Sequence, residues 1–131
     1  MTLQELYDGF AALPDWDEKF AYLAELGQAL PSFPAELKTE ENRVVGCASS
    51  VWISAREEGG RRRFLFESDA KIVRGLLYIL YLIFDNKTDA EIVAADAMDV
   101  FERIGLASAL SANRMVGISS AIAKIQGKPR T

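Results

Sequence analysis

Histidine is absent from the 131 residues of the sequence, and cysteine occurs once, as Cys47. Without histidine the chain lacks the commonest general base, the Ser-His-Asp and Cys-His arrangements, and any zinc site that needs imidazole. A lone cysteine excludes an intramolecular disulfide, a CxxC redox pair and a cluster site built from several thiolates of this chain. Any sulfur chemistry of the chain itself must therefore use Cys47.

Long apolar runs are also absent. The longest membrane-like stretch without a charge is residues 75–84, which is about half the length that spans a bilayer. The first five residues have neither the basic region nor the apolar segment of a secretory signal. We therefore expect a cytoplasmic protein that does not bind a membrane.

Excess positive charge is absent as well, since the net charge is −4. This balance argues against nucleic-acid binding, which needs a basic surface. The charge is uneven: residues 1–41 carry nine acids and two bases, whereas residues 42–75 carry seven bases and four acids. The three consecutive arginines at 61–63 stand beside two glycines, which is typical of a solvated hairpin end.

The sequence predicts two amphipathic helices before residue 31. Thr2 and Glu5 form a capping-box pattern ahead of apolar residues at helical spacing. Asp15 begins the second pattern, which ends before Pro31. Residues 31–41 have no sustained period, so we expect a loop there.

Strands are predicted from Arg43 onward, because β-branched and aromatic residues gather at 44–53 and 64–66. We expect two or three antiparallel strands, the last two joined by a hairpin at Gly59-Gly60. Helices before and after a small sheet make an α+β fold. No linker or repeat divides the chain, so we expect one domain over residues 1–131.

Further helices follow the strands. Ser68 or Asp69 can cap a long helix, apolar nearly all round, that we expect to be central to the core. A capping box at residues 88–91 begins another helical segment, and a short helix over 98–104 ends at a glycine. Ser111 is predicted to cap the last helix.

Residue chemistry leaves two interpretations of Cys47. A free cysteine is most often a buried, inert core residue. Small residues at 46–50 would instead leave the thiol accessible, and a reactive thiolate needs positive charge nearby. Arg43 is local, whereas Arg74 and Arg114 are distant candidates. With no histidine to move protons, such a thiol suits exchange with another sulfur better than hydrolysis.

Three separated segments, residues 42–52, 68–76 and 110–118, carry motifs in a characteristic order. Together they resemble the SufE family, the sulfur-acceptor proteins of iron–sulfur cluster assembly. The resemblance covers nearly the whole chain, and three ordered motifs are more specific than any one of them. It implies a fold in which a three-stranded antiparallel sheet packs against helices.

The resemblance also implies a function. Cys47 would accept sulfur from the persulfide of a SufS-type cysteine desulfurase, an enzyme that uses pyridoxal phosphate. The chain would stimulate that enzyme and relay the sulfur to a SufBCD-type cluster scaffold. It would act as an accessory protein rather than an enzyme, with no cofactor or metal of its own.

Supporting roles follow for four residues. Arg114 would stabilise the thiolate or persulfide anion, although a solvated arginine at a helix start is an alternative. Asp69 would lie near the cysteine or the partner surface, or would only interact with the first turn of a helix. Gly46 and Ser49 would keep the loop around Cys47 slim enough to enter a partner's pocket.

This chain departs from the family pattern at three positions. Ala48 and Ser50 stand where many members carry glutamines, which leaves open how the loop is hydrogen-bonded and which partner it prefers. Ala109 stands where some members have histidine, so no role for an imidazole carries over.

Three alternatives to the sulfur-carrier function stay open. The chain could dock on a desulfurase without carrying sulfur, or serve a paralogous desulfurase as a CsdE-type partner. The third alternative is a single-cysteine peroxidase or redox sensor, whose thiol would be oxidised to sulfenic acid.

Overall fold

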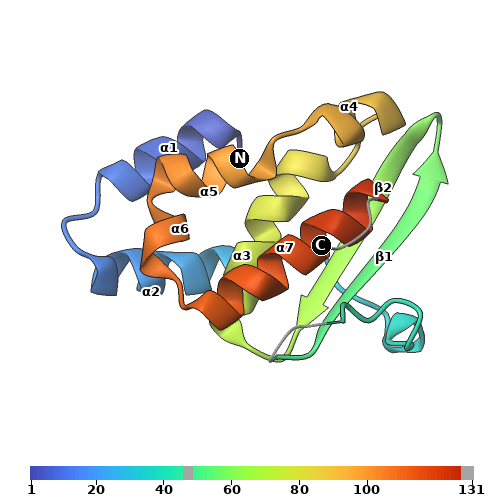
Figure 1. The fold of residues 1–131 in the computed structure, drawn as a ribbon, viewed down its shortest axis with the longest axis horizontal. Coiled ribbons are helices and arrows are strands. Elements are labelled where there is room, and N and C mark those ends of the chain that lie inside the picture. Colours follow the sequence, from blue (N-terminus) through green and yellow to red (C-terminus); the bar gives the residue numbers. More distant parts are fainter. Residues whose placement is uncertain (46–48, 128–131) are drawn as a thin grey trace.

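The computed structural model describes residues 1–45 and 49–127, and its helices surround one side of a β-hairpin (Figure 1). Two α-helices and one short 3₁₀ helix precede the hairpin, and five α-helices follow it. The elements are α1 (Leu3–Ala11), α2 (Trp16–Gly27), η1 (Ala35–Leu37), β1 (Val51–Glu58), β2 (Arg61–Ser68), α3 (Lys71–Phe84), α4 (Asp89–Ala94), α5 (Ala97–Ile104), α6 (Leu106–Ala109) and α7 (Ala112–Gln126). The predicted α+β class is confirmed.

Most helix starts are where the sequence predicts them. Capping boxes form at Thr2 and at Thr88. Each threonine side chain accepts the backbone N–H of the glutamate three residues later, and the side chain of that glutamate accepts the backbone N–H of the threonine. Asp15 and Ser111 cap α2 and α7 through their side-chain oxygens. These local hydrogen bonds satisfy backbone donors that the first turn of a helix leaves open.

The start of α3 differs from the prediction. Its N-cap residue is Ala70, which has no side chain able to cap, and the exposed Asp69 makes no capping bond. The hydroxyl of Ser68 instead accepts the backbone N–H of Ala70 at 3.3 Å. The predicted cap at Ser68 or Asp69 is therefore wrong, because β2 continues to Ser68 and the helix begins only at Lys71.

The sheet is a hairpin whose strands pair antiparallel from Val51 opposite Ser68 to Glu58 opposite Arg61. Gly59 and Gly60 both have positive φ, 60° and 79°, as a two-residue hairpin turn requires. The predicted hairpin is confirmed. The predicted third strand is not: across residues 1–45 and 49–127 the sheet has two strands.

A single bridge stands in place of the third strand. Arg43 lies opposite Trp52, and two backbone bonds accompany it, from Val44 N–H to the Val51 carbonyl and from Ile53 N–H to the Asn42 carbonyl. Before this bridge the chain turns, because the Asn42 side chain donates to a carbonyl in η1 at 2.8 Å. This turn limits the pairing of the described residues to one bridge.

Helix α3 is central to the core, as predicted. Its buried residues pack with both strands and with the neighbouring helices in one hydrophobic cluster. Gly75 and Gly27 let α3 and α2 approach closely: a Cβ on Gly75 would clash with the Leu23 carbonyl oxygen, and one on Gly27 would lie 2.8 Å from Arg74 Cβ. These contacts fix how α2 and α3 cross.

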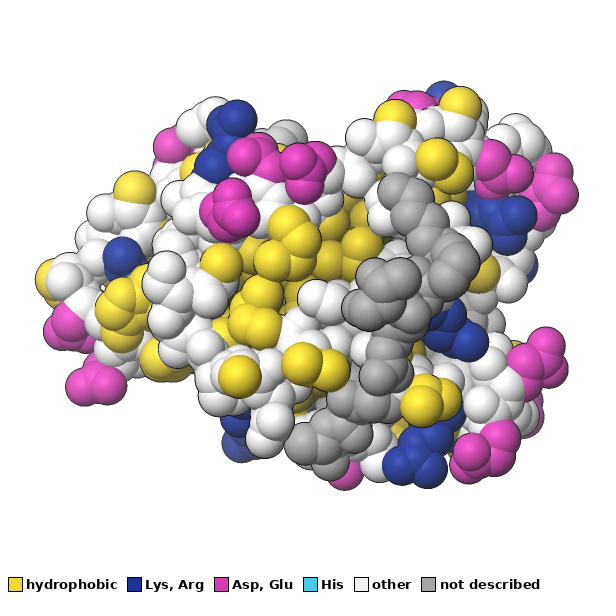
Figure 2. Space-filling model, in the orientation of Figure 1, with side chains coloured by type: hydrophobic (Ala, Val, Ile, Leu, Met, Phe, Trp, Pro, Cys, Tyr) yellow, Lys and Arg dark blue, Asp and Glu magenta, His cyan; other side chains and the backbone are white. Residues whose placement is uncertain are grey.

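The hairpin arginines are paired with acids on neighbouring segments. Arg61 lies 3.8 Å from Glu91, and Arg62 lies 2.6 Å from Asp89. Arg63 contacts the nearly buried Asp85 at 3.2 Å. Figure 2 shows basic and acidic side chains side by side along this edge of the molecule.

No helix within the described ranges is both long and apolar enough to cross a bilayer.

Candidate functional site

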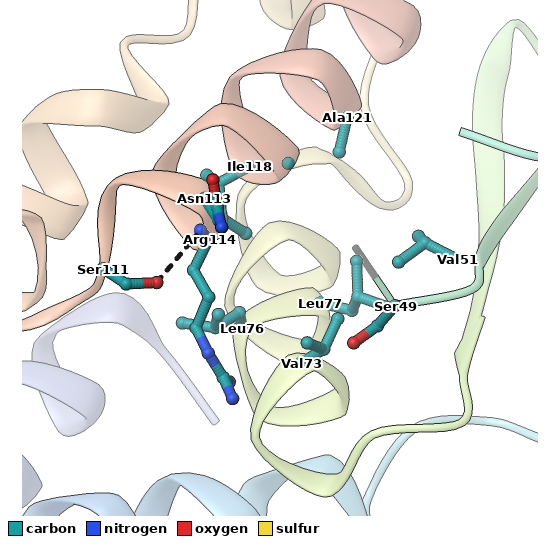
Figure 3. Close-up of a pocket in the computed structure, with 11 residues that line it drawn as sticks. Ser49, Val51, Val73, Leu76, Leu77, Ser111, Asn113, Arg114, Ile118 and Ala121 are labelled. Carbon is teal, nitrogen blue, oxygen red and sulfur yellow. Dashed lines mark hydrogen bonds between the residues drawn. The ribbon is translucent and has the colours of Figure 1, made fainter. Parts of the chain in front are cut away.

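A cavity of about 230 Å³ lies between α3, α7 and the beginning of β1 (Figure 3). It exceeds the roughly 150 Å³ of an apolar cavity that accommodates benzene, so a small side chain fits inside. Its walls are mainly apolar. The residues that form them are Val51, Val73, Leu76, Leu77, Gly117, Ile118 and Ala121.

Four polar residues line the same cavity: Ser49, Ser111, Asn113 and Arg114. Ser49 approaches from the strand side, and the other three come from the start of α7 (Figure 3). Hydroxyl, amide and guanidinium groups all donate hydrogen bonds. The cavity therefore combines apolar walls with several hydrogen-bond donors. This arrangement suits a ligand group that has an apolar part and carries a negative charge.

The N-cap of α7 positions Arg114 at the cavity. The Ser111 hydroxyl accepts the backbone N–H of Arg114 at 3.3 Å and fixes the first turn of the helix. The Arg114 side chain then extends from α7 past Leu76 at the cavity wall (Figure 3). It is exposed, and the helix dipole mildly disfavours a cation at this end of a helix.

Arg114 also differs from the other arginines in its pairing. Within residues 1–45 and 49–127 it is the one arginine without a carboxylate partner within 4.0 Å. The paired ones are Arg43, Arg56, Arg61, Arg62, Arg63, Arg74 and Arg103. An incoming anion at the cavity would thus meet a guanidinium that no acid of the described chain neutralises.

The other two arginines that the sequence suggested lie elsewhere. Arg43 pairs with Glu40 at 3.7 Å. Arg74 pairs with Glu67 and also donates to the Gly27 carbonyl at 3.2 Å, which ties α3 to β2 and α2. Neither lines the cavity.

The remaining predicted site residues divide into three cases. Ser49, the second residue after Cys47, lines the cavity together with Arg114. Asp69 is exposed and does not line it. Gly46 and Cys47 lie outside the described residues.

Sequence reasoning missed Asn113 and the small residues of α7. An asparagine in the first turn of a helix is ordinary, and the apolar residues of the cavity follow the same helical spacing as core residues. The one available signal was that Asn113 stands beside Arg114 in a motif of the family resemblance. Within the described residues, no group of three or more Cys, Asp or Glu could hold a metal ion.

Comparison with known proteins bears on the whole chain. The family model described as "SufE: Fe-S metabolism associated domain" matches residues 4–128. The chain belongs to the SufE family. Residues 4–128 include both sides of the cavity, from Ser49 to the start of α7. The match also includes the segment that carries Cys47.

Relatives within the SufE family match over most of their length. An uncharacterised SufE-like protein of Rhizobium meliloti is 41% identical over an alignment of 131 positions, which covers 97% of this chain and 94% of the relative. The sulfur acceptor protein CsdE of Escherichia coli is 36% identical over 121 residues, 92% of this chain and 82% of CsdE.

A solved structure supports the fold. The solution structure of a hypothetical protein from Thermus thermophilus matches with a TM-score of 0.76 and covers 98% of this chain and 95% of that one. The sequence identity is 21%, so the likeness concerns the fold alone.

Proposed function

We propose that this SufE-family chain is a sulfur acceptor that carries a persulfide on Cys47. One observation carries the proposal: the family match spans Cys47, which is the one thiol in the sequence. The relative CsdE is named a sulfur acceptor and is 36% identical. A cysteine-based acceptor of this sequence has no other residue on which to hold sulfur.

The proposed reaction is an exchange between two sulfur centres. The Cys47 thiolate attacks the outer sulfur of the desulfurase Cys–S–SH group, the S–S bond breaks, and the desulfurase cysteine leaves as a thiolate. A new S–S bond forms on Cys47, so sulfur is transferred with no net oxidation or reduction. The step needs neither a histidine nor a redox cofactor.

The cavity next to Ser49 supports this chemistry. A persulfide is polarisable and becomes an anion on losing its proton, so apolar walls with a few donors are a suitable environment. We propose that Arg114 stabilises this anion by its charge and that Ser49 donates a hydrogen bond. Gly46 keeps the loop slim, and the exposed Asp69 contributes to the surface that meets the partner.

The proposed partner is a SufS-type cysteine desulfurase, which the chain stimulates, and the proposed acceptor is a SufBCD-type scaffold. The 36% identity to CsdE supports the alternative that the chain serves a paralogous desulfurase instead. Comparing stimulation of both types of desulfurase distinguishes these partners.

Stimulation of the desulfurase tests the proposal. Wild-type protein should raise the rate at which the enzyme releases sulfur from L-cysteine, because Cys47 removes the persulfide from it. Cys47→Ser should abolish that increase while its melting temperature stays within a few degrees of wild type. Undiminished stimulation by Cys47→Ser would contradict the carrier mechanism and favour a docking module that carries no sulfur.

A further inference from the structure

A second concave site, which we call the hairpin pocket, has a volume of about 280 Å³ and lies on the face of the hairpin that points away from the core. Side chains along a strand alternate between its two faces. Ile53 and Phe66 are buried on the core face. Ser54 and Leu65 follow or precede them by one residue and lie opposite each other, so they belong to the other face. Both line the hairpin pocket.

Apolar residues from outside the hairpin complete the walls of the hairpin pocket. Pro31 and Leu37 come from the segment between α2 and β1, and Tyr81 comes from the last turn of α3. None of the three is buried, and Leu65 is also partly exposed, so a molecule from solvent can contact them. The volume exceeds the roughly 150 Å³ of an apolar cavity that accommodates benzene, so one ring with a short substituent fits.

Two arginines, Arg56 and Arg63, line the hairpin pocket and lie directly opposite each other on the two strands. Like charges in such a pair repel each other. Arg56 donates from Nη2 to Glu58 at 2.9 Å. Arg63 donates from Nε to Asp85 at 3.2 Å. A guanidinium group has five N–H donors, so each arginine keeps donors for a further acceptor.

The charge of the pocket lining is positive. Among the described residues that form it, the charged ones are the two arginines, and the acids that pair with them lie outside it. The side chains of Arg56 and Glu58 are 70% and 54% exposed. Such a surface pair contributes little to stability, so Arg56 can turn to another anion at small cost. Arg63 is held in place by the nearly buried Asp85.

We propose that the hairpin pocket binds a small molecule in which one apolar ring or short chain carries a carboxylate. The apolar part packs against Leu65 and Tyr81, and the carboxylate accepts hydrogen bonds from Arg56 and Arg63. Carboxylate oxygens match the planar donor geometry of a guanidinium group, and such charge-assisted bonds are stronger than neutral ones. The negative charge also reduces the repulsion between the two opposed arginines.

The hairpin pocket is separate from the cavity beside Arg114. Val51, which lines that cavity, belongs to the core face of β1, whereas Ser54 and Arg56 belong to the opposite face. No described residue lines both sites. The inference is therefore independent of the proposed sulfur transfer, and the purified chain alone is enough to test it.

Titration of the ¹⁵N-labelled protein, followed by NMR, measures binding and locates it. The probe is 3-phenylpropionate, which joins one ring to a carboxylate, and we expect a dissociation constant of about 1 mM for a ligand of this size. The largest shifts should be at the backbone amides of Ser54, Arg63 and Leu65. The neutral amide of the same shape, 3-phenylpropanamide, should bind about tenfold more weakly. Acetate, which has no ring, should cause no saturable shift below about 10 mM.

Variants test the charged and the apolar contacts separately. Arg56→Gln should weaken binding of 3-phenylpropionate about fivefold, because it removes one of the two charged donors. Arg56→Lys should restore part of the affinity. Arg61→Gln is the matched control: Arg61 lies on the same face of the hairpin but does not line the pocket, so affinity should stay unchanged. Ser54→Phe should abolish binding, because the added ring fills the pocket.

Three results would each overturn the proposal. The first is the absence of any saturable shift up to about 10 mM 3-phenylpropionate. The second is a set of shifts that maps only to the cavity beside Arg114 and disappears in Arg114→Ala. The third is a loss of charge selectivity: the neutral amide binds as tightly as the acid, or Arg61→Gln weakens binding as much as Arg56→Gln although both variants fold by circular dichroism.

Discussion

Arg114 is the residue that most clearly links the structure to the proposed chemistry. Each of the remaining arginines of the described chain forms a salt bridge. Arg114 instead lines an apolar cavity and has no carboxylate of the described chain within 4.0 Å. Its side chain is exposed, so its removal should affect an anion at the cavity more than stability.

Arg114→Ala should slow alkylation of Cys47 at neutral pH and move the midpoint of the rate against pH upward, because a nearby cation favours the thiolate. Arg114→Lys should restore part of the effect. The free energy of unfolding in urea should change by less than about 0.5 kcal/mol. Arg103→Ala is a matched control on an exposed helix surface. An unchanged pH profile, or an equal loss of stability, would contradict this role.

At the residue scale the sequence predicted part of the candidate site. The family resemblance pointed to Ser49 and Arg114, and both line the cavity. It also pointed to Asp69, which does not, because the bend after β2 leaves Asp69 exposed before α3 begins. Asn113 could not be singled out, since its place at the cavity depends on how α7 is rotated against α3.

Among the secondary-structure elements, the strongest predictions rested on local chemistry. Capping boxes at Thr2 and Thr88 and the glycine turn at 59–60 each need only neighbouring residues, and all three are present. The third strand failed because strand pairing is not local: a turn held by the Asn42 side chain limits the pairing to one bridge.

The crossing of α2 and α3 depends on Gly75, so Gly75→Ala tests this contact. Alanine normally favours a helix over glycine by about 1 kcal/mol. Here its Cβ would clash with the Leu23 carbonyl, which is backbone and cannot turn aside, so we expect a net loss of about 2 to 3 kcal/mol. Urea unfolding measures it.

The control for Gly75→Ala is Gly9→Ala in α1. There the added Cβ meets only the hydroxyl end of the Tyr22 side chain, which can move aside. It should therefore cost clearly less. Equal stability of Gly75→Ala and wild type would show that α2 and α3 do not depend on this close approach.

For the molecule as a whole, the cavity is a property that no single segment of sequence reveals. Leu76 and Ile118 have the spacing of core residues, and both are indeed buried. The space between them appears only once α7 is laid across α3 and the start of β1. The sequence could thus predict the helices around the cavity, but not the cavity itself.

The most direct test of the sulfur-acceptor proposal follows sulfur onto the whole protein. The chain is incubated with a cysteine desulfurase and L-cysteine, and its intact mass and proteolytic peptides are measured without reductant. We predict a gain of one sulfur atom, located on the peptide that contains Cys47, reversed by a thiol reductant and absent from Cys47→Ser. If the SufS-type and the paralogous desulfurase both turn over L-cysteine and wild-type protein gains no sulfur, or if Cys47→Ser gains it equally, the proposal is contradicted.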